Sequence, residues 1–418
     1  LLSRRQRQMC IRDRTRALAA VGGSTGQMVN LIVGFFVGLS SGATVIIARY
    51  YGAKNKKDLN DTLHTAAALS VAGGILITIA GILFTPSMLK IMKTPADVMA
   101  DSATYLRIYF GGIIFVFIYN VGSAILRAVG DSTRPLYFLI VCCFINIFLD
   151  VLLVVGFNMG VAGAAIATVV SQAVSAVLVI WALLKSTDMY CLHPKEIRFH
   201  KFLLVSIITI GLPAGIQSVM YNLANMIIQT SLNDLGTSTM AAYTAFGKID
   251  AIYWMISGAF SVSITTFIGQ NYGAQKYDRM KKSVKICLFM DFLASILVSA
   301  LLLFFGEYLL RLFTTDPEVL KVGMKIIHII APSYVLFIFI EILSSTLRGI
   351  GNVLVPMLMT CGGVCILRII WIFFVVPHRP GVSNILLCYP ISWGLTAVLF
   401  ILYYYTQQKK FFHAHQQI

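Results

Sequence analysis

Long runs of apolar residues, separated by short polar segments, dominate this chain. Stretches free of Asp, Glu, Lys and Arg occupy residues 17–48, 64–89, 151–184, 202–233 and 381–408. Each is longer than the roughly 20 residues that cross the hydrocarbon core of a bilayer as an α-helix. The pattern predicts an all-α integral membrane protein that crosses the lipid bilayer many times.

The same pattern predicts two groups of membrane spans with a polar segment between them. The first group lies near residues 20–48, 61–84, 103–126, 135–157 and 161–184, and the second lies near 202–232, 240–269, 283–305, 324–347, 354–377 and 381–406. Residues 185–201 contain Pro194, three Lys, one Arg and two His, a composition typical of a loop. We expect an amino-terminal lobe at 15–184, a cytoplasmic linker at 185–201, a carboxy-terminal lobe at 202–408 and a cytoplasmic tail at 409–418.

The two lobes are copies of one unit, because the chain aligns with itself at an offset of 221 residues. Matched pairs include Tyr51 and Tyr272, Arg127 and Arg348, Gly130 and Gly351, Pro135 and Pro356, and Gly160 and Gly381. A hydrophobic bias would match Leu with Leu by chance, but not Tyr, Arg, Gly and Pro together, so we infer a duplication. The basic loops 49–57 and 270–282 occupy equivalent places, which predicts parallel repeats. The span 202–232 has no counterpart, so we expect two six-helix lobes with the first helix missing and about 11 spans present.

Composition and charge narrow the class further. The chain is 58% hydrophobic and 12% charged, with a net charge of +16. Its basic residues lie in short loops rather than in one patch interleaved with aromatic residues, so we expect no nucleic-acid partner. They concentrate in alternate loops, which places those loops in the cytoplasm. Residues 1–14 are basic and polar without the apolar core of a signal peptide, and we expect them to be a non-native segment.

Several motifs together resemble the multidrug and toxic compound extrusion (MATE) family. They are GATVIIARYYGA at 42–53, LRAVGDSTRP at 126–135, NIFLD at 146–150, GVAGAAIAT at 160–168, GLPAG at 211–215 and GQNYGA at 269–274. The resemblance implies a two-lobed antiporter of a bacterial cytoplasmic membrane that exports drugs and other cationic or amphipathic small molecules by alternating access. It also implies coupling to H⁺ or Na⁺, with no other cofactor, and we expect a monomer. The resemblance also implies that the first helix, which in many members carries an Asp of the cation site, is the one we expect to be missing here.

The strongest candidate for the coupling site is Asp150, which lies inside an apolar span. An ionisable group there costs at least about 2.5 kcal/mol unless water, a partner or protonation relieves it. Asn146 lies one turn earlier on the same helix face, and Thr168 on the next helix would add a hydroxyl oxygen. These three residues resemble the amino-lobe cation site of the family. Such oxygens suit Na⁺, whereas a lone desolvated carboxylate suits H⁺, so both ions stay open, as does a capping or pairing role near the membrane surface.

Charges also interrupt the spans of the second lobe. We expect a polar substrate pathway formed by Glu341, Asp250, Lys248, Asn120, Trp254 and Tyr243, with Glu341 at the position equivalent to Asn120. The acids would attract cationic substrates and the aromatic rings would face them. The alternative is a network of interhelical ion pairs that also includes Arg368. Asp291 lies about two turns from a predicted helix end, so we expect it to reach the membrane surface.

Other functions fit the sequence less well. A lipid-linked saccharide flippase of the same superfamily is the main alternative, but it would favour a strongly cationic cavity to hold pyrophosphate. A membrane enzyme would need paired acidic motifs or a His pair for a metal, and we recognise none in the sequence, so we expect no enzyme activity and no metal site beyond Na⁺ at Asp150. A passive channel would not need two unlike lobes, and the acid at Asp150 is replaced by Trp371 in the second copy.

Overall fold

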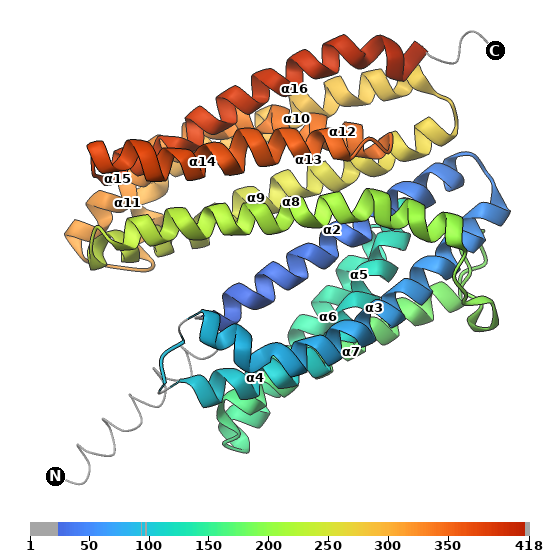
Figure 1. Ribbon diagram of the computed structural model, residues 1–418, viewed down its shortest axis with the longest axis horizontal. Coiled ribbons are helices and arrows are strands. Elements are labelled where there is room, and N and C mark those ends of the chain that lie inside the picture. The colour runs from blue at the N-terminus through green and yellow to red at the C-terminus, as the bar shows by residue number, and fades with distance from the viewer. Residues whose placement is uncertain (1–23, 93, 97, 414–418) are drawn as a thin grey trace. The chain divides into compact units, whose positions relative to one another are not determined.

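The computed structural model describes residues 24–92, 94–96 and 98–413, and this part of the chain is helical with no strand (Figure 1). Its α-helices are α2 (Ser24–Gly52), α3 (Lys56–Ile91), α4 (Met99–Gly111), α5 (Ile113–Ala128), α6 (Thr133–Asp150), α7 (Gly160–Leu184), α8 (Lys201–Asn233), α9 (Thr237–Gly273), α10 (Tyr277–Arg311), α11 (Pro317–Ile330), α12 (Tyr334–Gly349), α13 (Leu354–Thr360), α14 (Leu367–Ile370), α15 (Val382–Leu386) and α16 (Cys388–His413). In the described residues, 10 helices are long and apolar enough to cross a membrane, or up to 11 if the bent pair of α4 and α5 is one span. The predicted all-α membrane fold and its span count are confirmed. The predicted segment 1–14 lies outside the described residues.

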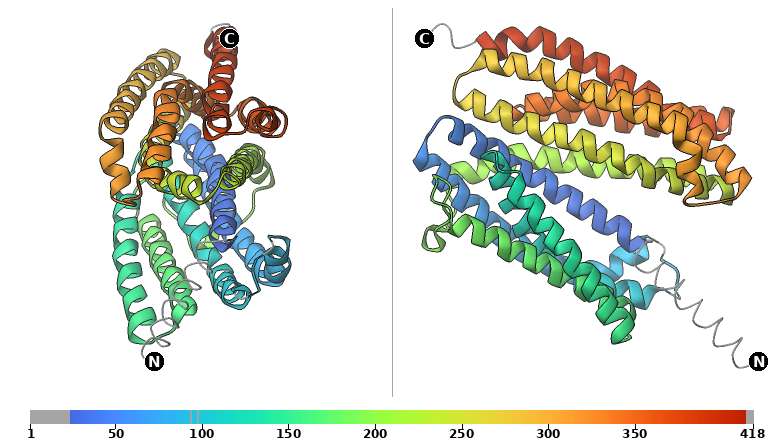
Figure 2. Two further views of the ribbon diagram at one scale, coloured as in Figure 1. Left: turned by 90° about the vertical axis from the view of Figure 1, so that its left-hand side faces the viewer. Right: turned by 180° about the vertical axis from the view of Figure 1, so that it is seen from behind.

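The chain forms two compact units, each built around its own packed helices. Unit 1 runs through Tyr51 and then from Asn55 to Gly211, and unit 2 contains Gly52–Lys54 and the chain from Leu212 onward. Within unit 1, α3 packs on α4 and α5, and α7 packs on α4, α5 and α6 (Figure 2). Within unit 2, α9 packs on α10, α11 and α12, and α16 packs on α12.

The boundary between the units lies inside α8 rather than at the predicted residue 202. The backbones of α2 and α8 meet at two glycines, because a Cβ on Gly42 would lie 2.8 Å from the backbone nitrogen of Gly211. Small residues allow this close approach, as in many membrane helix pairs. The first part of α8 therefore belongs to unit 1. At the other end of the chain, α16 continues to His413, into the segment predicted as a tail.

The duplication extends to backbone conformation. Three pairs of positive-φ residues recur at the 221-residue offset, namely Lys54 and Gln275 (56° and 56°), Gly130 and Gly351 (99° and 87°), and Gly160 and Gly381 (55° and 155°). Gly130 follows α5 and Gly351 follows α12, where a left-handed residue ends a helix. Gly130 and Gly351 therefore end equivalent helices in the two copies.

Two further breaks also occupy equivalent places. The chain bends by 47° between α4 and α5 at Gly112, and the 3₁₀ turn Ala331–Ser333 separates α11 from α12 at the corresponding point. A π-helical segment, Val151–Gly156, follows α6, and another, Trp371–Val375, follows α14. Such π segments are frequent at functional sites in helical proteins. The first one begins directly after Asp150.

Candidate functional site

Asp150 is the last residue of α6, and its side chain is half-buried. Its Oδ1 atom is inaccessible to solvent and has no hydrogen-bond partner. One turn earlier, Asn146 has a buried Nδ2 atom that also lacks a partner. Buried polar groups of folded proteins are normally paired, so the unpartnered carboxyl oxygen of Asp150 indicates a site whose ligand, a proton or a cation, satisfies it. The Nδ2 of Asn146 is a donor that a cation does not satisfy.

Two hydroxyl groups from neighbouring helices complete this site. Thr168 on α7 donates to the carbonyl oxygen of Ala164 at 2.9 Å, which leaves its oxygen free to accept. Tyr105 on α4 is 8% exposed, and its hydroxyl lies beside Thr168 and within electrostatic reach of Asp150. The structure thus places the predicted Asp150, Asn146 and Thr168 around a fourth residue, Tyr105. We call these four residues the unit 1 oxygen cluster.

The unit 1 oxygen cluster offers one carboxylate, one amide oxygen and two hydroxyl oxygens, drawn from three helices. This donor set fits a hard monovalent cation, and the unpartnered carboxyl oxygen also fits a proton. The π-helical segment after Asp150 offers a place where α6 can change its hydrogen bonding. Nothing in the sequence distinguishes Tyr105, because a Tyr in an apolar span is also common at membrane surfaces.

In unit 2, Asp250 is held by two aromatic donors. Its Oδ2 accepts from the indole Nε1 of Trp254 at 2.7 Å, and its Oδ1 accepts from the hydroxyl of Tyr334. The ring of Tyr253 stacks on Tyr334 with centroids 3.7 Å apart. The carboxylate of Asp250 therefore has partners for both oxygens before any ligand binds.

The ion pairs of the alternative charge network are absent from the described residues. Lys248 is exposed, and no ion pair joins it to Asp250 there. The reason is spacing, since residues two apart on a helix point to different sides. Tyr243, another predicted pathway residue, exchanges a hydrogen bond with Tyr389 at 2.9 Å.

Arg368 on α14 is fully enclosed in unit 2, at 2% exposure. Its guanidinium lies over the ring of Tyr389 at 4.1 Å and donates to Ser392 Oγ at 3.1 Å and to Asn225 Oδ1 at 3.3 Å. The Nη2 atom has no partner. Aromatic faces and neutral oxygens thus replace a carboxylate around this charge.

The remaining candidates divide between the units. In unit 1, Asn120 donates to the carbonyl oxygen of Val116 on its own helix at 2.8 Å. In unit 2, Glu341 on α12 is half-buried and lies within electrostatic reach of Tyr221 and Asp291. A substrate pathway shared by Asn120 and Glu341 stays a prediction.

The expectation for Asp291 is wrong. Its side chain is 0% exposed, so it does not reach the membrane surface. The predicted span began at residue 283, whereas α10 begins at Tyr277. Those extra residues are largely polar, and it is the packing of α10 on α9 and α12 that encloses Asp291.

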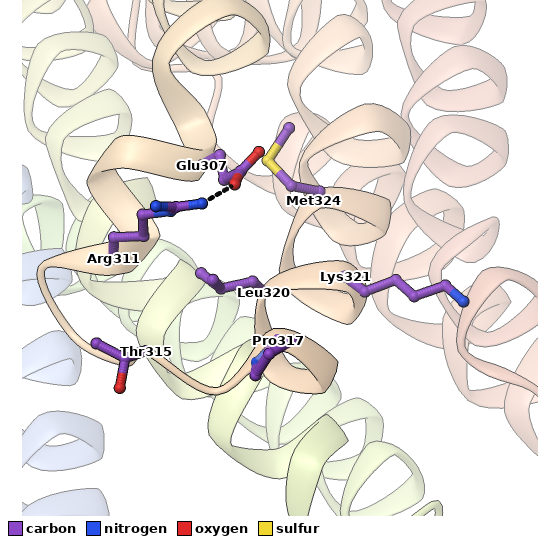
Figure 3. Close-up of a pocket in the computed structure, with 7 residues that line it drawn as sticks. All are labelled: Glu307, Arg311, Thr315, Pro317, Leu320, Lys321 and Met324. Carbon is purple, nitrogen blue, oxygen red and sulfur yellow. Dashed lines mark hydrogen bonds and ion pairs between the residues drawn. The ribbon is translucent and has the colours of Figure 1, made fainter.

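A surface pocket lies elsewhere in unit 2, where α10 ends and α11 begins (Figure 3). It is lined by Glu307, Arg311, Thr315, Pro317, Leu320, Lys321 and Met324. Arg311 donates to Glu307 at 2.7 Å, so the carboxylate in this pocket already has a cationic partner. None of the predicted site residues lines it.

Comparisons with known proteins agree with this architecture. The family model MatE matches residues 9–152 and 213–374. The chain is 29% identical over 404 residues to the probable multidrug resistance protein YoeA of Bacillus subtilis, covering 94% of this chain and 87% of that protein. It is 27% identical to the probable multidrug resistance protein NorM of Thermotoga maritima, covering 82% of this chain and 75% of that protein.

Solved structures share the fold at low sequence identity. The chain superimposes on an outward-facing conformation of a multidrug resistance MATE family transporter with a TM-score of 0.86 and 20% identity, covering 96% of this chain and 92% of that chain. A MOP superfamily transporter from Pyrococcus furiosus gives a TM-score of 0.88 and 21% identity, covering 95% of this chain and 89% of that chain. These likenesses extend over both units.

Proposed function

Because this chain belongs to the MatE family, we propose that it is a cation-coupled antiporter that exports drugs and other cationic or amphipathic small molecules, with Asp150 carrying the coupling ion. The family consists of transporters, and the apolar helices make the chain a multi-pass membrane protein. The proposed location is a bacterial cytoplasmic membrane, since relatives such as YoeA are bacterial.

One observation carries the proposal: the unpartnered, enclosed carboxyl oxygen of Asp150 within the unit 1 oxygen cluster. An ionised carboxylate without donors in a membrane span is strongly destabilised. Binding H⁺ or Na⁺ removes that cost, and loss of the ion restores it. This difference in free energy between the ion-bound and ion-free carboxylate favours one packing of α6 when the ion is bound and another when it is absent. Ion-driven alternating access requires such a difference.

The proposed substrate class follows from unit 2. Trp254 is 36% exposed and holds its indole against Asp250, so a flat cation reaching this place would meet both an aromatic face and a negative charge. Cations bind the faces of aromatic rings with about 0.5–2 kcal/mol each. Lipophilic aromatic cations such as ethidium are therefore suitable probe substrates.

A flippase for lipid-linked saccharides is the second candidate, and Arg368 is the observation in its favour. Its unpartnered Nη2 would suit a phosphate oxygen. The same unit, however, half-buries Asp250 and Glu341, which repel a pyrophosphate. We therefore prefer export of cationic compounds.

The test is ethidium efflux from bacterial cells that express the protein. Asp150→Asn should abolish energy-dependent efflux while leaving the amount of protein in the membrane unchanged. Asp101→Asn removes the same charge from an exposed position in the first turn of α4 and should leave efflux intact. Tyr105→Phe, which removes one oxygen of the cluster, should reduce efflux by about 10-fold, the equivalent of one hydrogen bond to a charged group. Unchanged efflux in Asp150→Asn would contradict the coupling role.

A further inference from the structure

Asp291 is a second enclosed carboxyl group, in the other unit. It lies 14 residues after Tyr277, about 21 Å along α10, and it is the one charged residue between Lys285 and Glu307. Its side chain is 0% exposed, and neither Oδ1 nor Oδ2 has a hydrogen-bond partner. Asp250, by contrast, has a donor on each oxygen.

The surroundings of Asp291 contain further polar atoms without partners. Ser295 lies one turn later on the same face of α10, and it is 1% exposed with an unpartnered Oγ. Ser257, which lies one turn after Tyr253 on the adjacent helix α9, is also 1% exposed with an unpartnered Oγ. The hydroxyl of Tyr253, which donates to the carbonyl oxygen of Tyr334 at 3.2 Å, lies beside Ser295 and within electrostatic reach of Asp291.

No positive side chain of the described residues compensates Asp291. The ionisable groups that interact with it are Glu341 on α12, Tyr253 on α9 and Cys287 on α10. All three are neutral or negative, and a second carboxylate makes ionisation of the first harder. An ionised Asp291 here would be an isolated buried charge, which proteins avoid by neutralising the group.

A proton neutralises Asp291 better than a metal ion does. Hard metal cations require several oxygen ligands arranged around them. Apart from the two oxygens of Asp291, its near neighbours supply hydroxyl groups. The hydroxyl group of Tyr253 already donates to a backbone carbonyl oxygen. A proton needs one carboxyl oxygen only. Ser295 can then accept from the protonated carboxyl group.

We propose that Asp291 is a proton-binding site in unit 2, separate from Asp150, with Glu341 as its charged neighbour, and that it exchanges its proton with water during transport. Enclosure holds the proton on Asp291, and the negative charge of Glu341 adds to this. When a cationic substrate or a proton neutralises Glu341, this added repulsion is lost and release of the Asp291 proton to water becomes easier. This inference rests on the proposed transport function for its role in the cycle, but not for the existence of the site.

The experiment is infrared spectroscopy of the purified protein with ¹³C-carboxyl-labelled Asp, which separates Asp from Glu by the isotope shift. The wild type should show a protonated Asp band that disappears in Asp291→Asn. Adding ethidium at constant pH should weaken this band and release protons, and Asp291→Asn should release fewer protons per bound ethidium. Asp278→Asn changes an exposed carboxyl group on the same helix and should alter neither signal.

Each outcome decides the proposal. If the Asp291 band changes neither on addition of ethidium nor between about pH 5 and 9, Asp291 is a fixed structural acid and the proposal is overturned. If the wild type instead shows no Asp291 band, while Na⁺ changes ethidium binding and Asp291→Asn removes that change, Asp291 is a sodium site. The proposal is then overturned too. If the wild type fails to transport ethidium but its Asp291 band titrates reversibly, the proton site stands and the proposed function fails. Asp291→Asn assigns the band, and its changes with ethidium and pH are then read in the wild type.

Discussion

His64 on α3 binds the linker that precedes α8 through a hydrogen bond, and replacing His64 should release this linker. The imidazole is 1% exposed. Its Nδ1 lies 2.7 Å from the carbonyl oxygen of Asn60, and its Nε2 accepts the backbone N–H of His193 at 2.9 Å. These two partners assign the ring proton to Nδ1. Both ring nitrogens are therefore used.

The cost of His64→Ala follows from these bonds. The backbone N–H of His193 loses the acceptor of a part-buried hydrogen bond, and a donor left unsatisfied there costs about 1–3 kcal/mol. The contact of Asn60 Nδ2 with Glu196 at 2.8 Å and the bond of the His200 N–H to Thr65 Oγ1 at 3.2 Å remain, so the linker is loosened rather than lost. A change of 1–3 kcal/mol raises the population of the released linker about 5- to 150-fold.

The assay is limited trypsin digestion in detergent, because Lys195 and Arg198 lie within the linker. With slow cleavage, the rate follows the population of the released form. His64→Ala should accelerate cleavage at these two residues at least about fivefold. His193→Ala keeps the backbone donor and should change the rate by no more than about twofold. Equal rates for His64→Ala and the wild type, or an equal rise in His193→Ala, would refute the assignment to this hydrogen bond.

Two further predictions concern unit 1. The hydrogen bond from Asn60 holds the pKa of Glu196 below its usual value, so the contribution of this carboxylate to holding the linker is complete above pH 4.5 and is lost as the pH falls further. Hydrogen exchange of the linker amides, corrected for its intrinsic pH dependence, should accelerate below that pH in the wild type but not in Glu196→Gln. Gly42→Ala would place a Cβ 2.8 Å from the backbone nitrogen of Gly211, and it should lower the melting temperature through a cost of about 1–3 kcal/mol. Gly258→Ala, where nothing lies within 4 Å of the new Cβ, should be neutral or stabilising, and equal melting of both variants would contradict the close approach of α2 and α8.

The sequence predicted the architecture well because the signals involved are long or repeated. Each span is a run of apolar residues, and the 221-residue offset is carried by Gly, Pro, Arg and Tyr, whose backbone and charge requirements differ from those of Leu or Val. The paired positive-φ residues explain why Gly130 and Gly351 recur. The π-helical segments had no such signal, since their residues are ordinary apolar ones.

The site was predicted less completely, because burial depends on how helices pack. Asp150, Asn146 and Thr168 carry polar atoms in apolar spans and were identifiable, whereas Tyr105 entered the site only through the packing of α4 on α7. The expectation for Asp291 was wrong because its burial comes from the packing of α10 on α9 and α12, which the sequence alone does not show.

The central claim is that Asp150 binds the coupling ion, and transport driven by a single imposed gradient tests it most directly. The protein is reconstituted into liposomes, and ethidium movement is followed under a pH gradient or under a Na⁺ gradient, each imposed alone. The account predicts that one of the two gradients drives transport in the wild type and that Asp150→Asn removes this response while Asp101→Asn retains it. Equal transport in Asp150→Asn and the wild type under the driving gradient, or wild-type transport that ignores both gradients, would contradict it.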